Sequence, residues 1–434
     1  MIHQFMEVTL TSITQYLTRI ATHFSRPSQF RFFLPGVLLL FFFNQFASAA
    51  VIGKVVQPFA SYTFTADDNL LRIRDKMDPL PLLGTRNLFD MSHRFTGGLM
   101  FEKEISRQRL TANLNWTHTS FDKFSFMDNN LKSLNSNWNW FLGNRLEGNM
   151  GASYVQSLAP LMFQPGVRNI RTEQTEFINA IWRFHPSWNL NGRYTRYDLS
   201  NDSPINIFRF LNRTEDRFEG GVDYLTSGRN TVGVLFRNII GDFPVLVPVG
   251  SSFADNSYDQ KEALAKINWA VSAKSNLSGT GGWVERNNAS FTARNFSGFN
   301  ARMTYHWQPT DKIGLSITGW RETAAMQQLT ASFSLNTGVR VVPSWDITQK
   351  IRLEGDFFYQ NMKFDRLSAL TDAALTLGVH NTLRNSAIKL IYTPYLGLQL
   401  SASIYNNHLK SDTNFGGFSA NGANINLQYT YGRR

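Results

Sequence analysis

A repeated hairpin pattern, clearest between residues 302 and 320, most constrains what this chain can fold into. Residues 302–307 and 313–320 alternate apolar and polar side chains on either side of a short polar turn at 308–312. Alternation with period two places one class of residue on each face of a β-sheet. The same pattern recurs from residue 54 to the C-terminus. A sheet of this kind makes sense as a closed barrel with lipid outside and water inside.

The alternation predicts an all-β fold, a transmembrane antiparallel barrel of eighteen strands, with sixteen as the alternative. Both numbers are even, as in single-chain bacterial outer-membrane barrels. The strands are expected at 54–65, 93–103, 108–121, 132–142, 146–158, 174–184, 188–198, 215–226, 230–240, 259–271, 275–286, 298–308, 312–322, 330–342, 350–362, 372–393, 397–409 and 421–432.

The connections between these strands alternate in length. Short turns are expected at 106–107, 143–145, 185–187, 227–229, 272–274, 309–311, 343–345 and 394–396. Longer polar loops are expected at 66–92, 122–131, 159–173, 199–214, 241–258, 287–297, 323–329, 363–371 and 410–420. Short periplasmic turns and long outer loops are the outer-membrane arrangement, which places both termini in the periplasm.

The N-terminus has the features of a signal peptide. Arg19, Arg26 and Arg31 precede an apolar run at 32–43, which is followed by Ala47-Ser48-Ala49. This order matches a basic region, an apolar region and a cleavage site, and the run is shorter than the about 20 residues of a spanning helix. We therefore expect a signal peptide at 1–49, a single barrel domain at 50–434 and the outer membrane of a Gram-negative bacterium. An uncleaved anchor is the alternative, and the true start codon stays open.

Tryptophan is unevenly placed along the predicted strands. The chain has 10 Trp and 36 Phe, although its mean hydropathy is only −0.25. Amphipathic rings favour the headgroup level of a membrane, so a girdle at one rim is expected, with ordinary strand aromatics as the alternative. The girdle residues lie near predicted short turns: Trp140, Trp182, Trp188, Trp269, Trp307 and Trp345.

The opposite phase of the strands carries polar and charged residues. A charge on the lipid face costs about 2–4 kcal/mol at the membrane midplane, so these positions are expected to line the lumen. The candidate lining residues are Arg193, Arg237, Lys266, Arg302, His306, Arg340, Arg352, Glu354 and Asp356. The acids Glu147, Glu219 and Asp223 share this phase, as do asparagines such as Asn135, Asn137 and Asn139. The net charge of +11 favours an anionic solute or polymer.

The sequence offers no catalytic, cofactor-binding or metal-binding motif, so the protein is not expected to be an enzyme. The zincin, nucleophile-elbow and P-loop patterns are missing, and the absence of cysteine excludes disulfides and thiolate metal sites. His306 is interpreted as a polar lining residue rather than a base, and Asp67-Asp68-Asn69 as an acidic loop tip rather than a calcium site. Basic residues are scattered without a run, so no nucleic acid is expected as a partner.

Several short strings, taken in their order and spacing, resemble one known family. They are Ser61-Tyr62-Thr63-Phe64, Asp67-Asp68-Asn69-Leu70-Leu71-Arg72, Ser106-Arg107-Gln108-Arg109-Leu110, Phe121-Asp122-Lys123-Phe124, Trp138-Asn139-Trp140-Phe141-Leu142-Gly143-Asn144-Arg145-Leu146-Glu147-Gly148, Gln156-Ser157-Leu158 and Pro186-Ser187-Trp188-Asn189-Leu190. In these strings the chain resembles the EpsL-type outer-membrane proteins of exosortase-associated exopolysaccharide systems.

The resemblance implies a porin-like channel that exports an extracellular polysaccharide. It implies a periplasmic polysaccharide-export protein as a partner, beside the polysaccharide and the outer-membrane lipid. The last strand, near 423–431, resembles the assembly signal read by the barrel-assembly machinery. Two alternatives stay open: a general or sugar-specific small-solute porin, and a barrel enzyme that modifies polymer or lipid. The loop at 241–258, which contains Phe, Val and Pro, is a candidate plug.

Overall fold

The computed structural model describes residues 55–228, 230–249, 252–290, 295–325, 333–364, 380–412 and 416–432. The predicted signal peptide at 1–49 lies outside these ranges, as do residues 372–379 of the strand expected at 372–393. No helix in the described part of the chain is long and apolar enough to cross a membrane.

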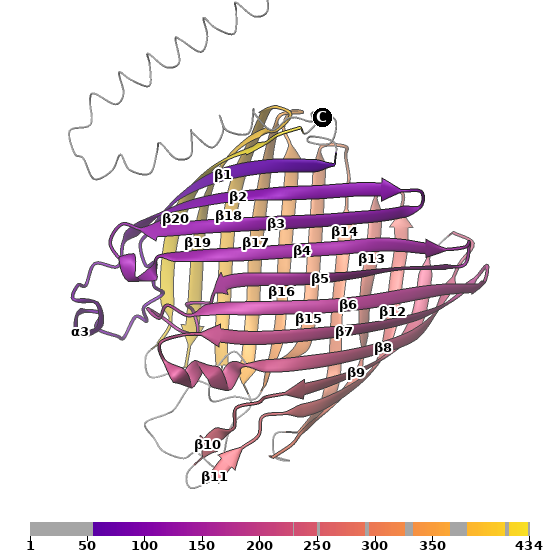
Figure 1. Ribbon diagram of the computed structural model, residues 1–434, viewed down its shortest axis with the longest axis horizontal. Helices are drawn as coiled ribbons and strands as arrows, with labels where there is room; N and C mark the ends of the chain where they lie inside the picture. Colours follow the sequence, from indigo (N-terminus) through magenta and orange to yellow (C-terminus); the bar gives the residue numbers. More distant parts are fainter. Residues whose placement is uncertain are drawn as a thin grey trace, which may run out of the picture. The chain divides into compact units, whose positions relative to one another are not determined.

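Within the described residues, eighteen strands form one antiparallel sheet that closes where β1 pairs with β20 (Figure 1). The first half of the barrel consists of β1 (Val56–Asp67), β2 (Asp90–Ile105), β3 (Gln108–Phe121), β4 (Asn129–Leu142), β5 (Leu146–Leu158), β6 (Ile170–His185), β7 (Trp188–Asp202), β8 (Arg213–Leu225) and β9 (Thr231–Asp242). The second half consists of β12 (Tyr258–Ser272), β13 (Ser275–Asn288), β14 (Phe296–Trp307), β15 (Ile313–Ala325), β16 (Phe333–Asp346), β17 (Ile351–Phe364), β18 (His380–Tyr395), β19 (Leu398–Ser411) and β20 (Phe418–Thr430).

Small elements occur in the connections. They are α3 (Leu80–Leu83), η2 (Ser125–Met127), η3 (Asn206–Leu211) and a hairpin of β10 (Val247–Val249) with β11 (Ser252–Ala254). The predicted all-β closed barrel of eighteen strands is confirmed, because each predicted strand overlaps one strand of the structure.

The connections alternate in length as predicted. Residues 106–107 join β2 to β3, whereas residues 68–89 join β1 to β2. We call the two rims the short-turn end and the long-loop end. β1 begins and β20 ends at the short-turn end, where the backbone N–H of Tyr431 donates to the carbonyl of Pro58. The long connections of β1–β9 gather on the left of Figure 1 and the short turns on the right.

The turn expected at 343–345 is wrong. β16 continues through Pro343 to Asp346, and the chain turns at 347–350 instead. The hydroxyl of Thr348 accepts hydrogen bonds from the backbone N–H groups of Lys350 and Ile351 there. Proline has no N–H to donate to a ladder. The pairing of β16 with β17 nevertheless continues past Pro343, from Val341 to Ser344, without a change of register. The proline was therefore misread as a turn signal.

The two faces of the sheet differ in character along the strands. On β19, Leu400, Ala402 and Ile404 occupy the outer phase, while Ser401 and Ser403 occupy the inner phase. Large apolar side chains of the outer phase remain exposed, and Ile404 is 62% exposed. An apolar exterior around a polar interior suits a sheet with lipid on one side and water on the other.

Candidate functional site

The interior wall of the barrel carries all nine predicted lining residues on one face. Register establishes this, since Arg193 is paired with Glu219, Glu219 with Arg237 and Arg237 with Glu262 on neighbouring strands. The same phase continues around the sheet to β17. Residues on this face also contact loop side chains inside the long-loop end, which identifies it as the inner face.

The inner face of β8 to β17 forms a wall of ion pairs, which we call the charged wall. Arg237 lies between two carboxylates, with Nε 2.5 Å from Glu219 Oε1 and Nη1 2.7 Å from Glu262 Oε2. Glu262 is only 5% exposed, so one carboxylate of this triad is almost fully buried. Lys266 Nζ lies 2.8 Å from Asp223 Oδ2 on the neighbouring side.

Two bidentate pairs continue the charged wall. Arg302 donates to both carboxylate oxygens of Glu322, at 3.0 and 2.6 Å, and its guanidinium lies over the Trp320 ring. Arg340 donates to both oxygens of Asp356, at 2.8 and 2.5 Å. These four charged side chains are roughly half exposed to the interior, so solvent weakens each pair.

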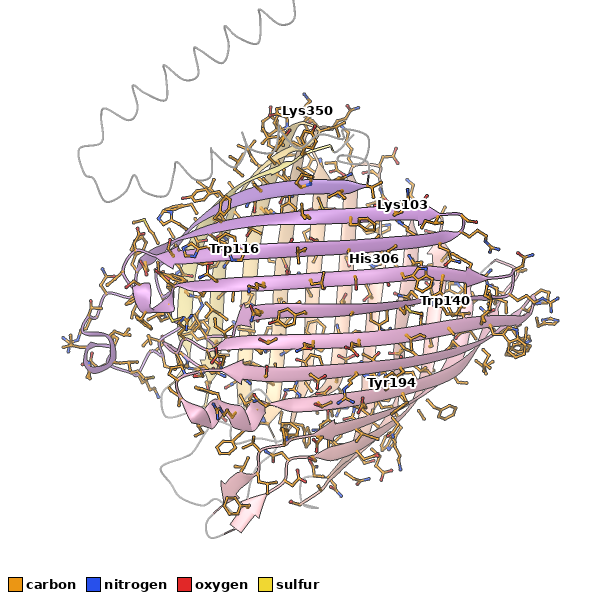
Figure 2. The ribbon with its side chains drawn as sticks, in the orientation of Figure 1. Lys103, Trp116, Trp140, Tyr194, His306 and Lys350 are labelled. Atoms are coloured by element: carbon orange, nitrogen blue, oxygen red, sulfur yellow. The ribbon has the colours of Figure 1, made fainter. Side chains whose placement is uncertain are left out.

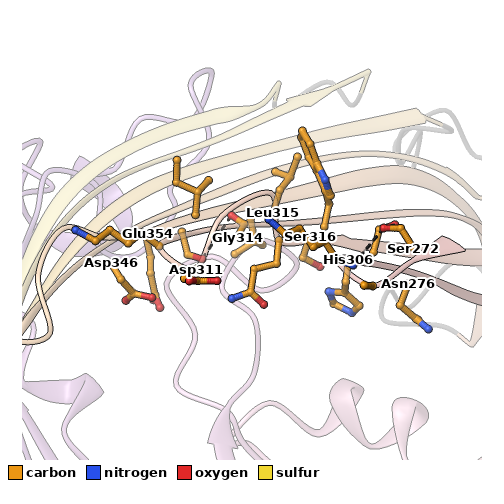
Figure 3. Close-up of a pocket in the computed structure, with 18 of the residues that line it drawn as sticks. Ser272, Asn276, His306, Asp311, Gly314, Leu315, Ser316, Asp346 and Glu354 are labelled. Carbon is orange, nitrogen blue, oxygen red and sulfur yellow. Dashed lines mark hydrogen bonds between the residues drawn. The ribbon is translucent and has the colours of Figure 1, made fainter. Parts of the chain in front are cut away.

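A cavity of about 550 Å³ lies against the charged wall at the short-turn end. Three predicted residues line it: His306, Arg352 and Glu354. Arg352 Nε lies 3.2 Å from Asp346 and 3.5 Å from Glu354. The imidazole of His306 makes no hydrogen bond with the side chain of another described residue. Figure 3 shows His306, Asp346 and Glu354 on the same side of the strands.

The sequence predicted an excess of positive charge along the lumen, but carboxylates on the same face pair with most of these cations. Arg237, Lys266, Arg302, Arg340 and Arg352 each contact a carboxylate.

Arg193 is the exception among the predicted cations. It donates to the Thr195 hydroxyl and lies 5.2 Å from the centroid of the Phe177 ring, and it contacts no described carboxylate.

Sequence reasoning missed three of the carboxylate partners: Glu262, Glu322 and Asp346. Glu262 and Glu322 lie on the inner phase of strands that were predicted, so the alternation was the available signal. Asp346 lies beyond the predicted strand end at 342, because the turn at 343–345 was misplaced.

A second wall, formed by β3, β4 and β5, carries amides instead of charges in its middle. Asn149 Nδ2 donates to Asn137 Oδ1 at 2.9 Å, and Asn137 Nδ2 donates to Asn139 Oδ1 at 3.0 Å. The carbonyl oxygens of Asn113 and Asn115 are buried and accept no hydrogen bond from a described group. A cavity of about 540 Å³ lies against this wall. We call it the amide wall.

Strands β1 and β20 extend the uncharged inner surface. The Thr65 hydroxyl donates to Asn424 Oδ1 at 2.7 Å, and Asn426 Nδ2 donates to the Thr63 hydroxyl at 2.8 Å. The interior is therefore divided into an ion-paired sector and an amide and hydroxyl sector. This division follows from which strands are neighbours and was not predicted.

Loops pack together over the amide sector at the long-loop end. Met162 and Phe163 of the β5–β6 loop pack against an inner apolar cluster on β17 to β20 that includes Met362 and Phe418. A second cluster joins the β1–β2 loop to the β3–β4 loop through Leu71, Ile73, Phe124 and Met127. These contacts place side chains of the β5–β6 loop against the inner face at the long-loop end.

Arg74 ties the packed loops together. Its Nη2 donates to the carbonyl of Met162 at 2.6 Å, and its Nη1 donates to the carbonyl of Gly416 at 3.4 Å. Burial lowers the pKa of the Arg74 guanidinium from its ordinary value, and the charge of Asp75 partly opposes that change.

The described residues of the loop expected as a plug, 241–258, take part in a separate buried cluster, in which Phe243 and Tyr258 pack with Ile239. The loop carries the β10–β11 hairpin, whose Phe253 is 72% exposed.

The six predicted girdle tryptophans share the outer phase near the short-turn end. Trp182, Trp188, Trp269, Trp307 and Trp345 are each at least 37% exposed, and Trp140 is partly covered. Figure 2 shows Trp140 towards the short turns and Trp116 towards the long loops. Aromatic rings at both rims of an apolar exterior are typical of outer-membrane barrels, and the protein is a barrel of this type.

The acidic residues Asp67 and Asp68, interpreted from the sequence as a loop tip, form contacts that hold the β1–β2 loop. Asp67 contacts Arg72 at 2.9 Å and accepts a hydrogen bond from the Tyr405 hydroxyl, while Asp68 accepts hydrogen bonds from Asn421. Among the described residues, no group of three or more His, Cys, Asp and Glu side chains is placed to hold a metal ion.

Comparison with known proteins finds similarity of fold only. No protein-family model and no curated protein sequence matches the chain. Solved structures that resemble it include Acinetobacter baumannii OccAB3, at TM-score 0.44 and 10% identity, covering 87% of this chain and 99% of that one. Pseudomonas aeruginosa OccK2 gives TM-score 0.46 and 8% identity, covering 87% and 98%, and it has also been solved in complex with glucuronate. A BenF-like porin from Pseudomonas fluorescens Pf-5 gives 0.45 and 9%, covering 87% and 99%.

Proposed function

We propose that this outer-membrane barrel is a porin-like channel for small, hydroxyl-rich solutes of the sugar type. The amide wall is the observation that carries the proposal. Its amide side chains offer donors and acceptors at short intervals along the strands, as in the chain of Asn149, Asn137 and Asn139. A solute hydroxyl can exchange hydrogen bonds with such a surface at little net cost, because each neutral bond replaces one with water.

The charged wall supports a solute of low net charge. Each pair consists of two opposite charges within 4 Å, so the field of the pair falls quickly towards the lumen axis. A strongly anionic solute would gain little from Arg302 or Arg340, whose guanidinium groups already face carboxylates. Arg193 remains as one cation that a sugar acid can contact.

The closed sheet supports passage through the interior. A barrel of about eighteen strands is wide enough to hold an aqueous channel. The loop cluster at the mouth sets the size limit, since Met162 and Phe163 lie inside the long-loop end. In the membrane the short-turn end faces the periplasm and the long loops face the exterior. Residues 1–49 serve as the export signal in this proposal.

A liposome-swelling assay tests the solute class. The variant Asn113→Ala/Asn135→Ala/Asn137→Ala should slow the entry of a neutral disaccharide about threefold, because hydrogen-bonding partners are removed from the path. The matched control is Arg340→Gln/Asp356→Asn, which removes a pair without changing the net charge and should leave disaccharide entry unchanged. Equal rates for the wild type and the triple variant would contradict the proposal.

Export of an extracellular polysaccharide is the second candidate. The ordered motifs that resemble EpsL-type proteins favour it, and an uncharged amide surface also suits a sliding polymer. A polymer requires the packed loops to move aside, and it implies a periplasmic polysaccharide-export protein as a partner. Deleting the gene separates the candidates: lost surface polymer with unchanged sugar uptake supports export, and the reverse supports the small-solute channel.

A further inference from the structure

Charges on the outer face of the barrel are unevenly distributed at the long-loop end. From β6 to β13 the outward positions near this rim carry mostly acids, namely Glu176, Asp198, Asp216, Asp242, Asp259 and Glu285. From β17 to β19 the outward positions carry cations instead. Lys363, Arg384 and Lys410 come from three successive strands and are all exposed. We call these three residues the rim cation patch.

The three cations lie close enough to contact one headgroup. Lys363 is paired with His380, Lys410 with Thr382, and Arg384 with His408. Neighbouring strands are about 4.8 Å apart, so Lys363 and Lys410 are separated by about 10 Å across the sheet. Arg384 lies on β18, between those two strands, and farther from the long-loop end than either lysine. The long side chains can therefore converge on one ligand from both sides.

Among the described residues, no carboxylate pairs with these cations. None of the three forms an ion pair with a described residue, in contrast to the cations of the charged wall. Among the described residues of this sector, Asp412 is the nearby acid, and it contacts His380 rather than the patch. The Arg384 guanidinium lies 5.6 Å from the Tyr359 ring centroid, which leaves its N–H groups available for an acceptor.

Below the patch the outer surface passes a tier of polar residues that includes Ser386 and Asn406, and it then becomes apolar. On β18 the outward residues after Arg384 include Ile388, Leu390 and Tyr392, which are 43–46% exposed. On β19 they include Ile404 and Leu400. Cations above an apolar band mark the level where lipid headgroups meet acyl chains, and long basic side chains reach towards that level. A ligand that matches this surface carries anionic groups above hydrocarbon chains.

We propose that the rim cation patch binds the phosphate groups of a phosphorylated glycolipid of the outer leaflet. The phosphates contact Lys363, Arg384 and Lys410, because phosphate oxygens accept charge-assisted hydrogen bonds from both Lys and Arg. The acyl chains lie along the apolar outer faces of β17, β18 and β19. The acidic sector from β6 to β13 disfavours the same lipid, so the barrel has one preferred side for it.

Native mass spectrometry of the full barrel in detergent tests this assignment with diphosphorylated lipid A as the probe. The variant Lys363→Gln/Arg384→Gln/Lys410→Gln should bind the probe at least about tenfold more weakly, because three cations near an anionic headgroup are lost. Lipid A without its phosphates should bind the wild type and the variant equally. Retained heat-modifiable mobility in gel electrophoresis confirms that the variant barrel is folded.

A matched control removes three outward cations of the same rim outside the patch. Lys132→Gln/Arg196→Gln/Lys261→Gln should retain wild-type affinity for the probe, and the single variant Arg384→Lys should retain most of it. Equal weakening in the patch and control variants would overturn the proposal, since it would indicate a general charge effect. Displacement of the lipid by equimolar inorganic phosphate would also overturn it, because the site would then recognise a free anion.

Discussion

Arg237 is the residue whose neighbours matter most for stability, because it separates Glu219 from Glu262 on the inner wall. Arg237→Met would leave two carboxylates facing each other, one of them only 5% exposed. We expect this change to lower the free energy of unfolding by about 3 kcal/mol, the range found when one partner of a buried pair is removed. Urea unfolding in lipid vesicles, followed by tryptophan fluorescence, measures it.

Arg340→Met is the matched comparison for that prediction. Its partner Asp356 is 41% exposed, so the loss should be at most about 1 kcal/mol. Equal losses for the two variants would mean that burial does not set the strength of these pairs.

We expect Arg193 to affect the ion selectivity of the proposed channel. Because it contacts no described carboxylate, Arg193→Gln removes a charge that reaches the lumen directly. The reversal potential in a salt gradient should shift towards cation preference, as expected when a cation is lost from a pore wall. The charge-neutral double variant Arg340→Gln/Asp356→Asn should cause no such shift. A shift in the double variant alone would contradict the assignment of Arg193.

The alternation of residues predicted which face of the sheet each side chain lies on. Alternation predicted one phase for the nine candidate lining residues, and the register places them on one face of the sheet, since a strand has only two faces. Their ion-pair partners were not predictable, because partners depend on the register between strands, which turn geometry sets. Glu322 illustrates this: it is 20 positions from Arg302 in the sequence and meets it only through the β14–β15 hairpin.

We expect the β5–β6 loop to affect passage through the proposed channel more than the other loops. Replacing residues 161–167 with a short Gly-Ser linker would remove Met162 and Phe163 from the inner cluster. We expect single-channel conductance to rise about twofold, because the mouth widens while the wall stays closed. Shortening the β10–β11 hairpin by removing residues 247–254 is the control and should leave conductance unchanged. The opposite outcome would return the plug role to 241–258.

Strand prediction succeeded where alternation was regular and failed where a local signal competed with the ladder. β3 and β5 begin and end where the alternation placed them. Pro343 was read as a turn, although β16 accommodates a proline within the strand. The inward packing of the β1–β2 and β5–β6 loops was not predictable, since it depends on apolar residues brought together by barrel closure.

The whole molecule is oriented in the membrane by its apolar exterior. Ile388 lies on the outer face of β18 and is 46% exposed, whereas the next residue, Lys389, lies on the inner face. Ile388→Arg should lower the free energy of unfolding in lipid vesicles by about 2–4 kcal/mol, the cost of a cation on the lipid face near the midplane. Ala387→Arg places the same group on the inner face and should cost less. Equal costs would mean that the two faces are misassigned.

We propose that the closed sheet encloses a water-filled path through the membrane, and planar-bilayer recording tests this most directly. The purified barrel should give stepwise, ohmic conductance, and a neutral oligosaccharide added to one side should interrupt the current briefly as it contacts the amide wall. A folded, inserted barrel that gives no conductance steps would contradict the channel.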